Sequence, residues 1–474
     1  MYLFLFVENE VGENIMAVDS VLKYMATNEI RWVDLQFFDV TGKMNKVTVS
    51  SKIIEEASFT KGIHGADLSP ALGGTEAGEL VLLPDPDTAA RLPWEVSTIR
   101  LLCDVIVATT NERYLKDSRY VSERIETNLK ALGVKEARIG STAEFYIFDT
   151  VTVDRTTEGR GSGTLIDSRE AYWGPSALSS EKNGAYLAQP FDSMYPARIQ
   201  VGESMEEGFG YTVEKHFHGR SPTSQQGVTL RAYPLQTAAD AVQTLKFVVR
   251  NLANAVNSNA TFMPYPIKGE KGNMLQMHQS LWKSADNNIF YDGGDSYAQI
   301  SNSGRYYIGG LLEHAPVLCL FTNPTTNSYK RLAVDSKTVG WSRDSKDAIV
   351  QVPLTRKNYK EGRYITFALP DPSANAYLAY AAIVAAGLDG IKKKIDPGDP
   401  VEKESTSKKK KKTEWKELPG TLYESIEALE SDPTFLKGVI PTELLEEYLD
   451  IKLKEYSNSK TAISAWEMRH YFNV

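Results

Sequence analysis

The chain has 474 residues, of which 42% are hydrophobic and 24% charged. This composition excludes a disordered or collagen-like protein, and the length allows two or about three domains. The formal net charge of −8 disfavours a protein whose main task is to bind nucleic-acid phosphates. Two cysteines, Cys103 and Cys319, are too few for a disulfide framework or a cysteine-rich zinc site, so we expect a cytoplasmic protein.

The N-terminal residues Met1–Val7 are apolar, but the segment is far too short to span a bilayer. It also lacks the basic region of a signal peptide. We therefore interpret it as an extra edge strand or a packing tail and expect no membrane association.

The first part of the chain is rich in predicted strands. Residues 31–49 predict a β-hairpin, because a β-rich segment is followed by a glycine-containing turn and a second strand. Residues 80–85 and 99–105 predict two more short strands. A helix is expected over 122–132, with Gly133 as its stop signal. The block before this helix is therefore expected to be a small, sheet-rich domain.

The rest of the chain mixes strands and helices without regular alternation, which favours an α+β fold over a doubly wound sheet. A long loop rich in glycine, serine and asparagine is expected over 155–192. The other predicted elements are strands over 137–149 and 213–218 and helices over 238–255, 307–319 and 374–388.

The sequence contains few features typical of nucleotide-binding or metal-binding sites. There is no P-loop and no His-Glu-x-x-His motif, and the glycine run 159–163 follows no strand, which favours a flexible loop. His216 and His218 are two residues apart on a predicted strand and share a face, so a metal pair is the alternative to ordinary polar packing. The lysine run 408–412 lies in a polar segment, 391–419, and favours a solvated surface loop over an anion-binding patch.

Several segments, in chain order, resemble glutamine synthetase of the bacterial and archaeal type I. The most specific is the long run Asn323-Pro-Thr-Thr-Asn-Ser-Tyr-Lys-Arg-Leu332. The other matching segments are Val33–Asp39 with Thr41–Lys43, Leu83–Asp85, Pro93-Trp94, Cys103–Val105, Ala143–Phe148, Ala260–Pro264, Tyr307–Gly310, Pro370–Asn375, Ala385–Ile391 and Trp466–Phe472.

The resemblance covers nearly the whole chain and implies an N-terminal β-grasp domain followed by a large catalytic-type domain. We assign residues 1–18 to an N-terminal extension, 19–110 to the β-grasp domain and 111–474 to the catalytic-type domain. The family also implies a homo-oligomer, a dodecamer of two stacked hexameric rings. Each active site would lie between the small domain of one subunit and the large domain of the next.

The family joins ammonia to glutamate with ATP, and divalent ions neutralise the phosphates. Magnesium and manganese prefer oxygen ligands, so the family's site is built from glutamates and one histidine. When these positions are carried over residue by residue, only Glu144 is retained. The positions at which the ligand is lost are Thr142, Gly219, Gly227, Gln276 and Thr366.

Other catalytic parts also differ from the family pattern. Two arginines correspond to Lys346 and Gln351, and a third corresponds to Ala368. The stretch between Arg331 and Trp341 is about three residues shorter than in the family and lacks the glutamate that closes over the site. An arginine that stabilises phosphoryl transfer can contribute about 10³–10⁵ in rate.

Some family positions are retained. Asp39 matches the aspartate that helps to bind ammonium, Arg331 matches a catalytic arginine, and His278 and Ser280 match the nucleotide side of the site. We favour structural roles: Asp39 would cap a turn and Arg331 would form an ion pair.

The losses favour a catalytically inactive glutamine synthetase paralogue that acts as an assembled scaffold, or that regulates an active paralogue by co-assembly or by binding a metabolite. No cofactor is expected, and magnesium or manganese with ATP would bind only if this interpretation is wrong. The alternatives are a ligase acting on another acid or amine and a still-active glutamine synthetase. Lys215, Arg220 and Lys271 lie near the altered segments; we favour a solubility role for them over replacement of the metal charge.

Overall fold

The structure is a computed structural model, and it divides into two compact units. The first contains the described residues up to Tyr120 together with Glu203–Tyr211, and the second contains the rest. Met1–Val7, the lysine run and most of the glycine run lie outside the described residues. The described residues are 18–64, 67–72, 79–153, 163–173, 184–335, 337–343, 345–356, 358–401 and 415–474.

The first unit is built on a six-stranded sheet with the order β2-β1-β5-β3, in which β4 and β6 also pair with β5. The predicted hairpin is present, because β1 and β2 pair antiparallel from Trp32–Ser50 to Phe38–Met44. The elements of this unit are α1 Val18–Thr27, β1 Trp32–Phe38, β2 Met44–Ser50, η1 Ser51–Ile53, α2 Ser58–Lys61, α3 Ser69–Leu72, β3 Leu80–Pro84, η2 Pro86–Thr88, β4 Ala90–Leu92, β5 Glu95–Val107, β6 Glu112–Arg113 and η3 Ser204–Gly208.

The hydrophobic core of this unit lies on one face of the sheet. Val33, Leu35 and Phe37 alternate along β1 and pack with Val21 and Met25 of α1. The alternation puts these three side chains on one face of the strand, and the residues between them are buried as well. The core forms without a disulfide, since Cys103 is a buried thiol.

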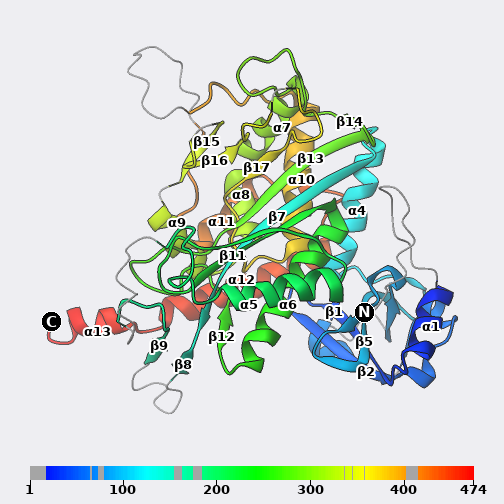
Figure 1. Ribbon diagram of the computed structural model, residues 1–474. Coiled ribbons are helices and arrows are strands. Elements are labelled where there is room, and N and C mark those ends of the chain that lie inside the picture. Colours follow the sequence, from blue (N-terminus) through cyan, green and yellow to red (C-terminus); the bar gives the residue numbers. More distant parts are fainter. Residues whose placement is uncertain are drawn as a thin grey trace, which may run out of the picture. The chain divides into compact units, whose positions relative to one another are not determined.

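The second unit is built on a nine-stranded sheet with the order β10-β11-β7-β13-β17-β16-β15, and β12 and β14 extend β7 and β13. Figure 1 shows the long strands β11, β7 and β13 side by side. The strands are β7 Glu136–Phe148, β8 Thr150–Val153, β9 Thr164–Asp167, β10 Val213–His218, β11 Gln225–Pro234, β12 Asn259–Thr261, β13 Leu275–Ser284, β14 Asn287–Asn288, β15 Thr338–Ser342, β16 Ala348–Gln351 and β17 Ile365–Phe367.

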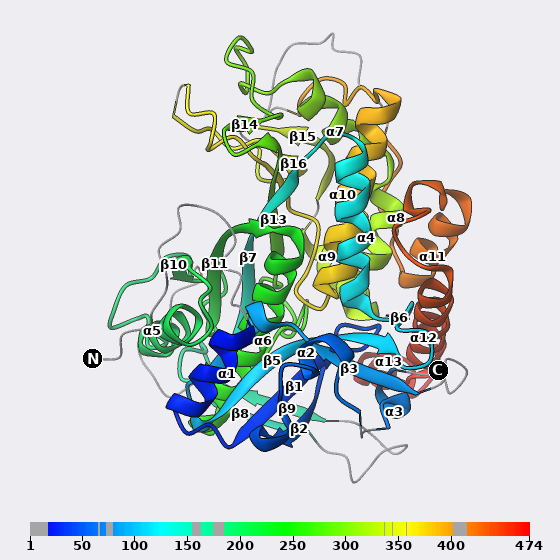
Figure 2. The same ribbon diagram turned by 90° about the vertical axis from the view of Figure 1, so that its right-hand side faces the viewer.

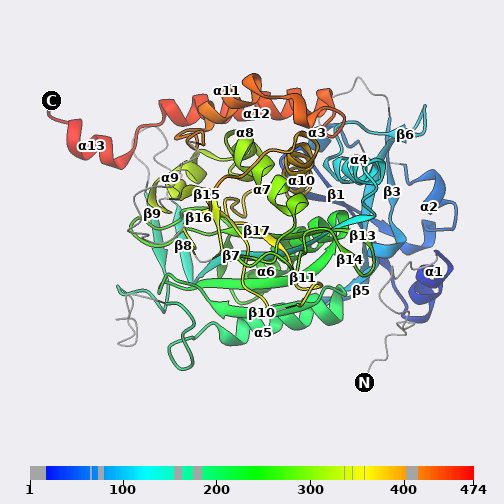
Figure 3. The same ribbon diagram turned by 90° about the horizontal axis from the view of Figure 1, so that it is seen from above.

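Helices cover one face of this sheet in successive layers. α6 packs on β7 and β11, α10 packs on α6 and α7, and α8 lies between α10 and α11, an order that can be followed in Figures 2 and 3. α4 begins in the first unit and continues into the second. The helices are α4 Ser118–Ala131, α5 Tyr195–Glu203, α6 Leu235–Ala255, α7 Asn302–Glu313, α8 Ala315–Thr322, α9 Thr326–Asp335, α10 Ala376–Lys393, α11 Leu422–Ser431, η4 Thr434–Leu436, α12 Thr442–Thr461 and α13 Ala465–Tyr471.

Two local predictions need correction. The helix expected over 307–319 is two helices, because the chain turns at His314 and Pro316 begins α8 in its first turn. The loop expected over 155–192 contains a strand, since β9 pairs antiparallel with β8. No helix among the described residues is long and apolar enough to cross a membrane.

A buried lysine in the helical layer gives a test of this packing. Lys246 of α6 donates through Nζ to the carbonyl oxygen of Ala374 at 2.9 Å. Burial, followed by the nearby positive charge of Arg250, lowers the pKa of Lys246 to about 7. The unfolded chain binds this proton up to the ordinary pKa of lysine, so the free energy of unfolding should rise with pH above pH 7.

We predict that Lys246→Met removes this rise. The stability of the wild-type chain relative to the variant should increase by roughly 1–2 kcal/mol between about pH 7 and about pH 9, as measured by urea unfolding at both pH values. If the difference in unfolding free energy between wild type and variant were the same at both pH values, Lys246 would be charged in the folded protein.

Candidate functional site

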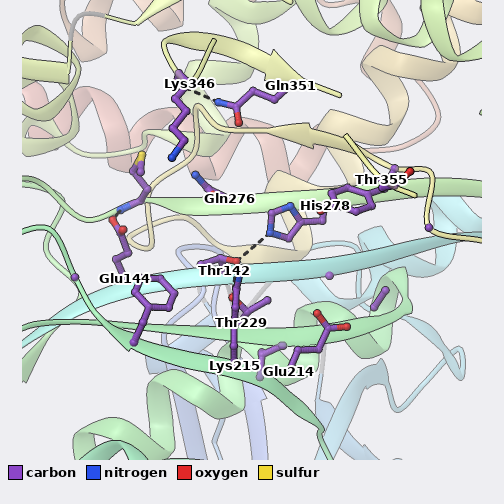
Figure 4. A pocket seen from close by; sticks show the side chains of 18 of the residues that line it. Thr142, Glu144, Glu214, Lys215, Thr229, Gln276, His278, Lys346, Gln351 and Thr355 are labelled. Atoms are coloured by element: carbon purple, nitrogen blue, oxygen red, sulfur yellow. Dashed lines mark hydrogen bonds between the residues drawn. The ribbon is translucent and has the colours of Figure 1, made fainter. Parts of the chain in front are cut away.

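A cavity of about 930 Å³ lies against the nine-stranded sheet of the second unit. Its floor comes from β7, β11 and β13, and its walls come from β10 and from the segment 346–364. Figure 4 shows the side chains of Thr142, Gln276 and His278 close together at the floor. Sequence-predicted residues that line the cavity are Thr142, Glu144, Gly219, Gln276, His278, Ser280, Lys346 and Gln351.

The alternation of strand residues places these side chains on the face away from the helices. On β7, Ser141 faces the helical layer and its hydroxyl lies 2.5 Å from that of Tyr380 on α10. Its neighbour Thr142 therefore faces the cavity. β13 behaves in the same way: Gln279 accepts a hydrogen bond from Tyr307 of α7, while His278 lines the cavity.

A chain of hydrogen bonds crosses the cavity floor. The Thr142 hydroxyl lies 2.8 Å from the hydroxyl of Thr229 and 2.9 Å from Nε2 of His278. Nδ1 of His278 lies 2.9 Å from the hydroxyl of Thr366. A neutral imidazole donates from one nitrogen and accepts at the other, so the two threonine hydroxyls can satisfy both ring atoms.

The imidazole of His278 is held in its neutral form. Burial, and secondarily the positive charge of Lys215, lowers the pKa of His278 to about 4. Thr366 does not line the cavity, but its hydroxyl contacts the imidazole of His278, which does. We call Thr142, Thr229, His278 and Thr366 the hydroxyl–imidazole chain.

Glu144 is the one retained carboxylate among the predicted ligands. Its Oε2 accepts a hydrogen bond from the backbone N–H of Met274 at 3.0 Å. Burial raises the pKa of Glu144 to about 7, against the opposing effects of this hydrogen bond and of Arg220. At neutral pH this carboxyl therefore carries only part of a negative charge.

The two glycines among the predicted ligand positions have other side chains against them. A Cβ atom on Gly219 would lie 2.6 Å from Cγ of Gln225, and a Cβ atom on Gly227 would overlap the ring of Phe217. Gly227 pairs with Phe217 on one side and with Glu144 on the other. Larger residues at 219 and 227 therefore require their neighbours to move.

The upper wall carries the residues that replace family arginines. Nε2 of Gln351 donates to the carbonyl oxygen of Lys346 at 3.1 Å, and Nζ of Lys337 donates to the same oxygen at 3.0 Å. Figure 4 shows the Lys346 side chain extending into the cavity toward Gln276.

Two retained positions lie elsewhere and make structural contacts. In the first unit, Oδ1 of Asp39 accepts from the backbone N–H groups of Thr41 and Lys43, each at 2.9 Å, and caps the β1–β2 turn. In the second unit, buried Arg331 forms an ion pair with Asp335 at 2.8 Å. These are contacts that structural roles for Asp39 and Arg331 would use; the structural roles themselves stay a prediction.

The histidine pair on β10 has separate partners. Nε2 of His218 lies 3.2 Å from Glu170, and Nδ1 of His216 accepts from Arg198 at 3.3 Å. Within the described residues, no group of three or more His, Cys, Asp or Glu side chains is arranged to hold a metal ion.

Several cavity residues were not predicted from the sequence. The aromatic side chains of Phe217, Tyr359 and Tyr364 line the cavity, as do Lys337 and Arg356. Thr229 gave no signal in the sequence, because no strand was predicted around it; the structure places it beside Thr142 through strand register. Of the three cations considered, Lys215 and Arg220 line the cavity and Lys271 does not.

Comparison with known proteins identifies the family. Residues 115–471 match the glutamine synthetase catalytic domain, and residues 29–108 match the glutamine synthetase beta-Grasp domain. The chain belongs to the glutamine synthetase family. The predicted α+β fold, with an N-terminal β-grasp domain and a large catalytic-type domain, is confirmed.

Relatives cover nearly the whole chain. A glutamine synthetase of Sulfolobus acidocaldarius is 38% identical over 92% of this chain and 94% of its own length. One of Vibrio cholerae is 33% identical over 97% of this chain and 100% of its own length. The Plasmodium falciparum glutamine synthetase structure has a TM-score of 0.86 at 24% identity, covers 96% of this chain and 99% of its own, and is similar in fold.

The family implies divalent ions, so the side chains at its ligand positions would have to supply suitable donor atoms. The donors comprise the hydroxyls of Thr142 and Thr366, the Gln276 amide and the single carboxyl of Glu144, while Gly219 and Gly227 offer no side-chain donor. Several anionic oxygens are needed to hold two or three magnesium or manganese ions. The residues present do not fit such a group of ions.

We predict that Gly227→Ala destabilises the protein by about 1–3 kcal/mol, because the added methyl group overlaps the Phe217 ring. Gly202→Ala is a matched control, since nothing lies within 4 Å of a Cβ atom there. In urea unfolding, Phe217→Ala should cost less in the Gly227→Ala background than in the wild type. Strictly additive effects would contradict the packing described for Gly227.

Proposed function

We propose that this chain is a member of the glutamine synthetase family that has kept the fold and lost the ATP-dependent ligation of ammonia to glutamate. The observation that carries the proposal is the hydroxyl–imidazole chain. In the family, two of these positions, those of Thr142 and Thr366, carry anionic metal ligands. In this chain they carry neutral groups that form hydrogen bonds with His278. A site without those ligands leaves the triphosphate charge unneutralised.

Other positions support the same conclusion. Gly219 and Gly227 offer no ligand atom and are packed against Gln225 and Phe217. The replacement of two family arginines by Lys346 and Gln351 removes fixed guanidinium groups that would stabilise phosphoryl transfer. We further propose Glu144 as the one remaining metal-ligand position, with Asp39 and Arg331 as structural residues.

The retained fold supports a role in an assembly. We propose a cytoplasmic homo-oligomer, a dodecamer of two hexameric rings, in which residues 19–110 and 111–474 act as the two domains after an extension over 1–18. Such an assembly would serve as a scaffold or regulate an active paralogue by co-assembly. We assign no nucleic-acid or membrane partner.

Two alternatives have specific support. The names of the curated relatives, at 33–38% identity, favour a still-active glutamine synthetase. The cations along the cavity wall favour a ligase for another acid or amine, in which lysine and arginine replace metal charge. Both predict ATP turnover, which the proposed function does not.

We predict that the purified full-length chain makes no γ-glutamyl hydroxamate from glutamate, hydroxylamine, ATP and Mn²⁺. The Sulfolobus acidocaldarius relative provides the positive control under identical conditions. Product at a comparable rate would refute the proposal in favour of an active glutamine synthetase. A second assay, ATP hydrolysis with a panel of acids and amines, would detect the altered ligase.

A second prediction concerns restored metal binding. Residues 142, 276 and 366 lie on adjacent strands, with Gln276 beside Thr142 and His278 beside Thr366. The triple variant Thr142→Glu, Gln276→His and Thr366→Glu should bind at least one Mn²⁺ per chain in isothermal titration, whereas the wild type should not. It avoids the two packed glycines. A folded variant that fails to bind Mn²⁺ would show that these positions are not the family's ligands.

A further inference from the structure

The charges along the cavity wall are unbalanced. Five basic side chains line it, from Lys215, Arg220, Lys337, Lys346 and Arg356. The acidic side chains along it are those of Glu144, Glu214 and Glu361. A concave surface of this kind concentrates positive potential and attracts anions.

These five cations lack carboxylate partners in the described part of the chain. Elsewhere two buried arginines are paired with carboxylates: Arg119 with Asp85 and Asp104, and Arg198 with Asp192. No such ion pair within 4.0 Å involves Lys215, Arg220, Lys337, Lys346 or Arg356 among the described residues. Lys337 is already bonded to the carbonyl oxygen of Lys346, whereas the charges of the other four side chains are not neutralised by a described carboxylate within 4.0 Å.

The backbone of Lys346 holds the side chain of Lys337 in the upper wall. The Nζ atom of Lys337 donates to the carbonyl oxygen of Lys346, and Gln351 donates to the same oxygen. Lys346 itself extends into the cavity (Figure 4). Arg220, beside Gly219, lines the same cavity. A ligand in the cavity would therefore meet several cations.

The size and chemistry of the cavity limit the ligand. Small-molecule sites are usually about 300–1,000 Å³, and this cavity measures about 930 Å³. Phe217, Tyr186, Tyr359 and Tyr364 add aromatic surface. The hydroxyl–imidazole chain contributes neutral hydrogen-bonding groups on the floor.

We propose that this cavity binds a small organic polyanion, with at least two phosphate or carboxylate groups, directly on lysine and arginine side chains and without a divalent ion. The proposal rests on the proposed function, because a cavity that held divalent ions would meet the anion through metal instead. Lys346 and Arg220 are the principal anion-binding side chains. Such a site would give a non-catalytic chain a way to respond to a metabolite.

The test is isothermal titration of the full-length chain with pyrophosphate and, separately, with citrate, both in EDTA. These two arms distinguish a phosphate ligand from a carboxylate one. We expect at least one of them to bind, and Lys346→Gln to weaken that binding about tenfold or more, since a hydrogen bond to a charged group contributes roughly 1.5–3 kcal/mol. Arg220→Gln should also weaken it.

Lys283→Gln is the charge-matched control. Lys283 lies on β13, the strand that carries His278, but it is exposed and does not line the cavity. This variant should bind as the wild type does. Replacing EDTA with excess Mg²⁺ should weaken pyrophosphate binding, because the ion competes for the anion.

Three results would overturn the inference: no binding of either probe, equal binding by Lys346→Gln, Arg220→Gln and wild type, or binding that requires Mg²⁺. The hydroxamate assay separates the two proposals. An inactive chain that binds neither probe contradicts only the polyanion site. An active, Mn²⁺-dependent chain contradicts the proposed function as well.

Discussion

The hydrogen bonds between Thr142, His278 and Thr366 are the constraint on which the account of this site depends. They link three strands, β7, β13 and β17, across the cavity floor. Each bond joins neutral groups, and burial keeps the imidazole uncharged. Buried polar groups that satisfy one another need no ion, whereas a set of facing carboxylates would repel without one. The polar groups of Thr142, His278 and Thr366 are therefore satisfied without a bound ion.

The sheet explains how the fold can persist while the chemistry of its surface changes. Odd-numbered residues of β7, such as Ser141, pack against α10, while Thr142 and Glu144 face the cavity. Substitution on the cavity face leaves the helical face intact. Lys337 and Lys346 flank the strands β15 and β16 and line the upper wall from outside them. Fold and chemistry occupy opposite faces of the same strands.

The family was predictable from the sequence, because the long Asn323–Leu332 run is a local signal, and so were several strands and helices. The central strands β11 and β13 were not predicted, and the register that places Gln276 beside Thr142 came from the structure. What the sequence could not supply was the packing around the changes. That Phe217 lies against Gly227 and Gln225 against Gly219 depends on side-chain conformation. The break at His314 had a local signal in Pro316, which begins the next helix, whereas the pairing of β9 with β8 is a contact between two segments that composition alone did not indicate.

The most direct test of the central claim is a cryo-electron microscopy structure of the full-length chain at side-chain resolution, prepared with excess Mn²⁺ and ADP. The account predicts that the cavity floor keeps the hydrogen bonds of Thr142, His278 and Thr366, with no ion density beside Glu144. Density for two ions coordinated near Glu144, by these or by other acidic side chains, would contradict it.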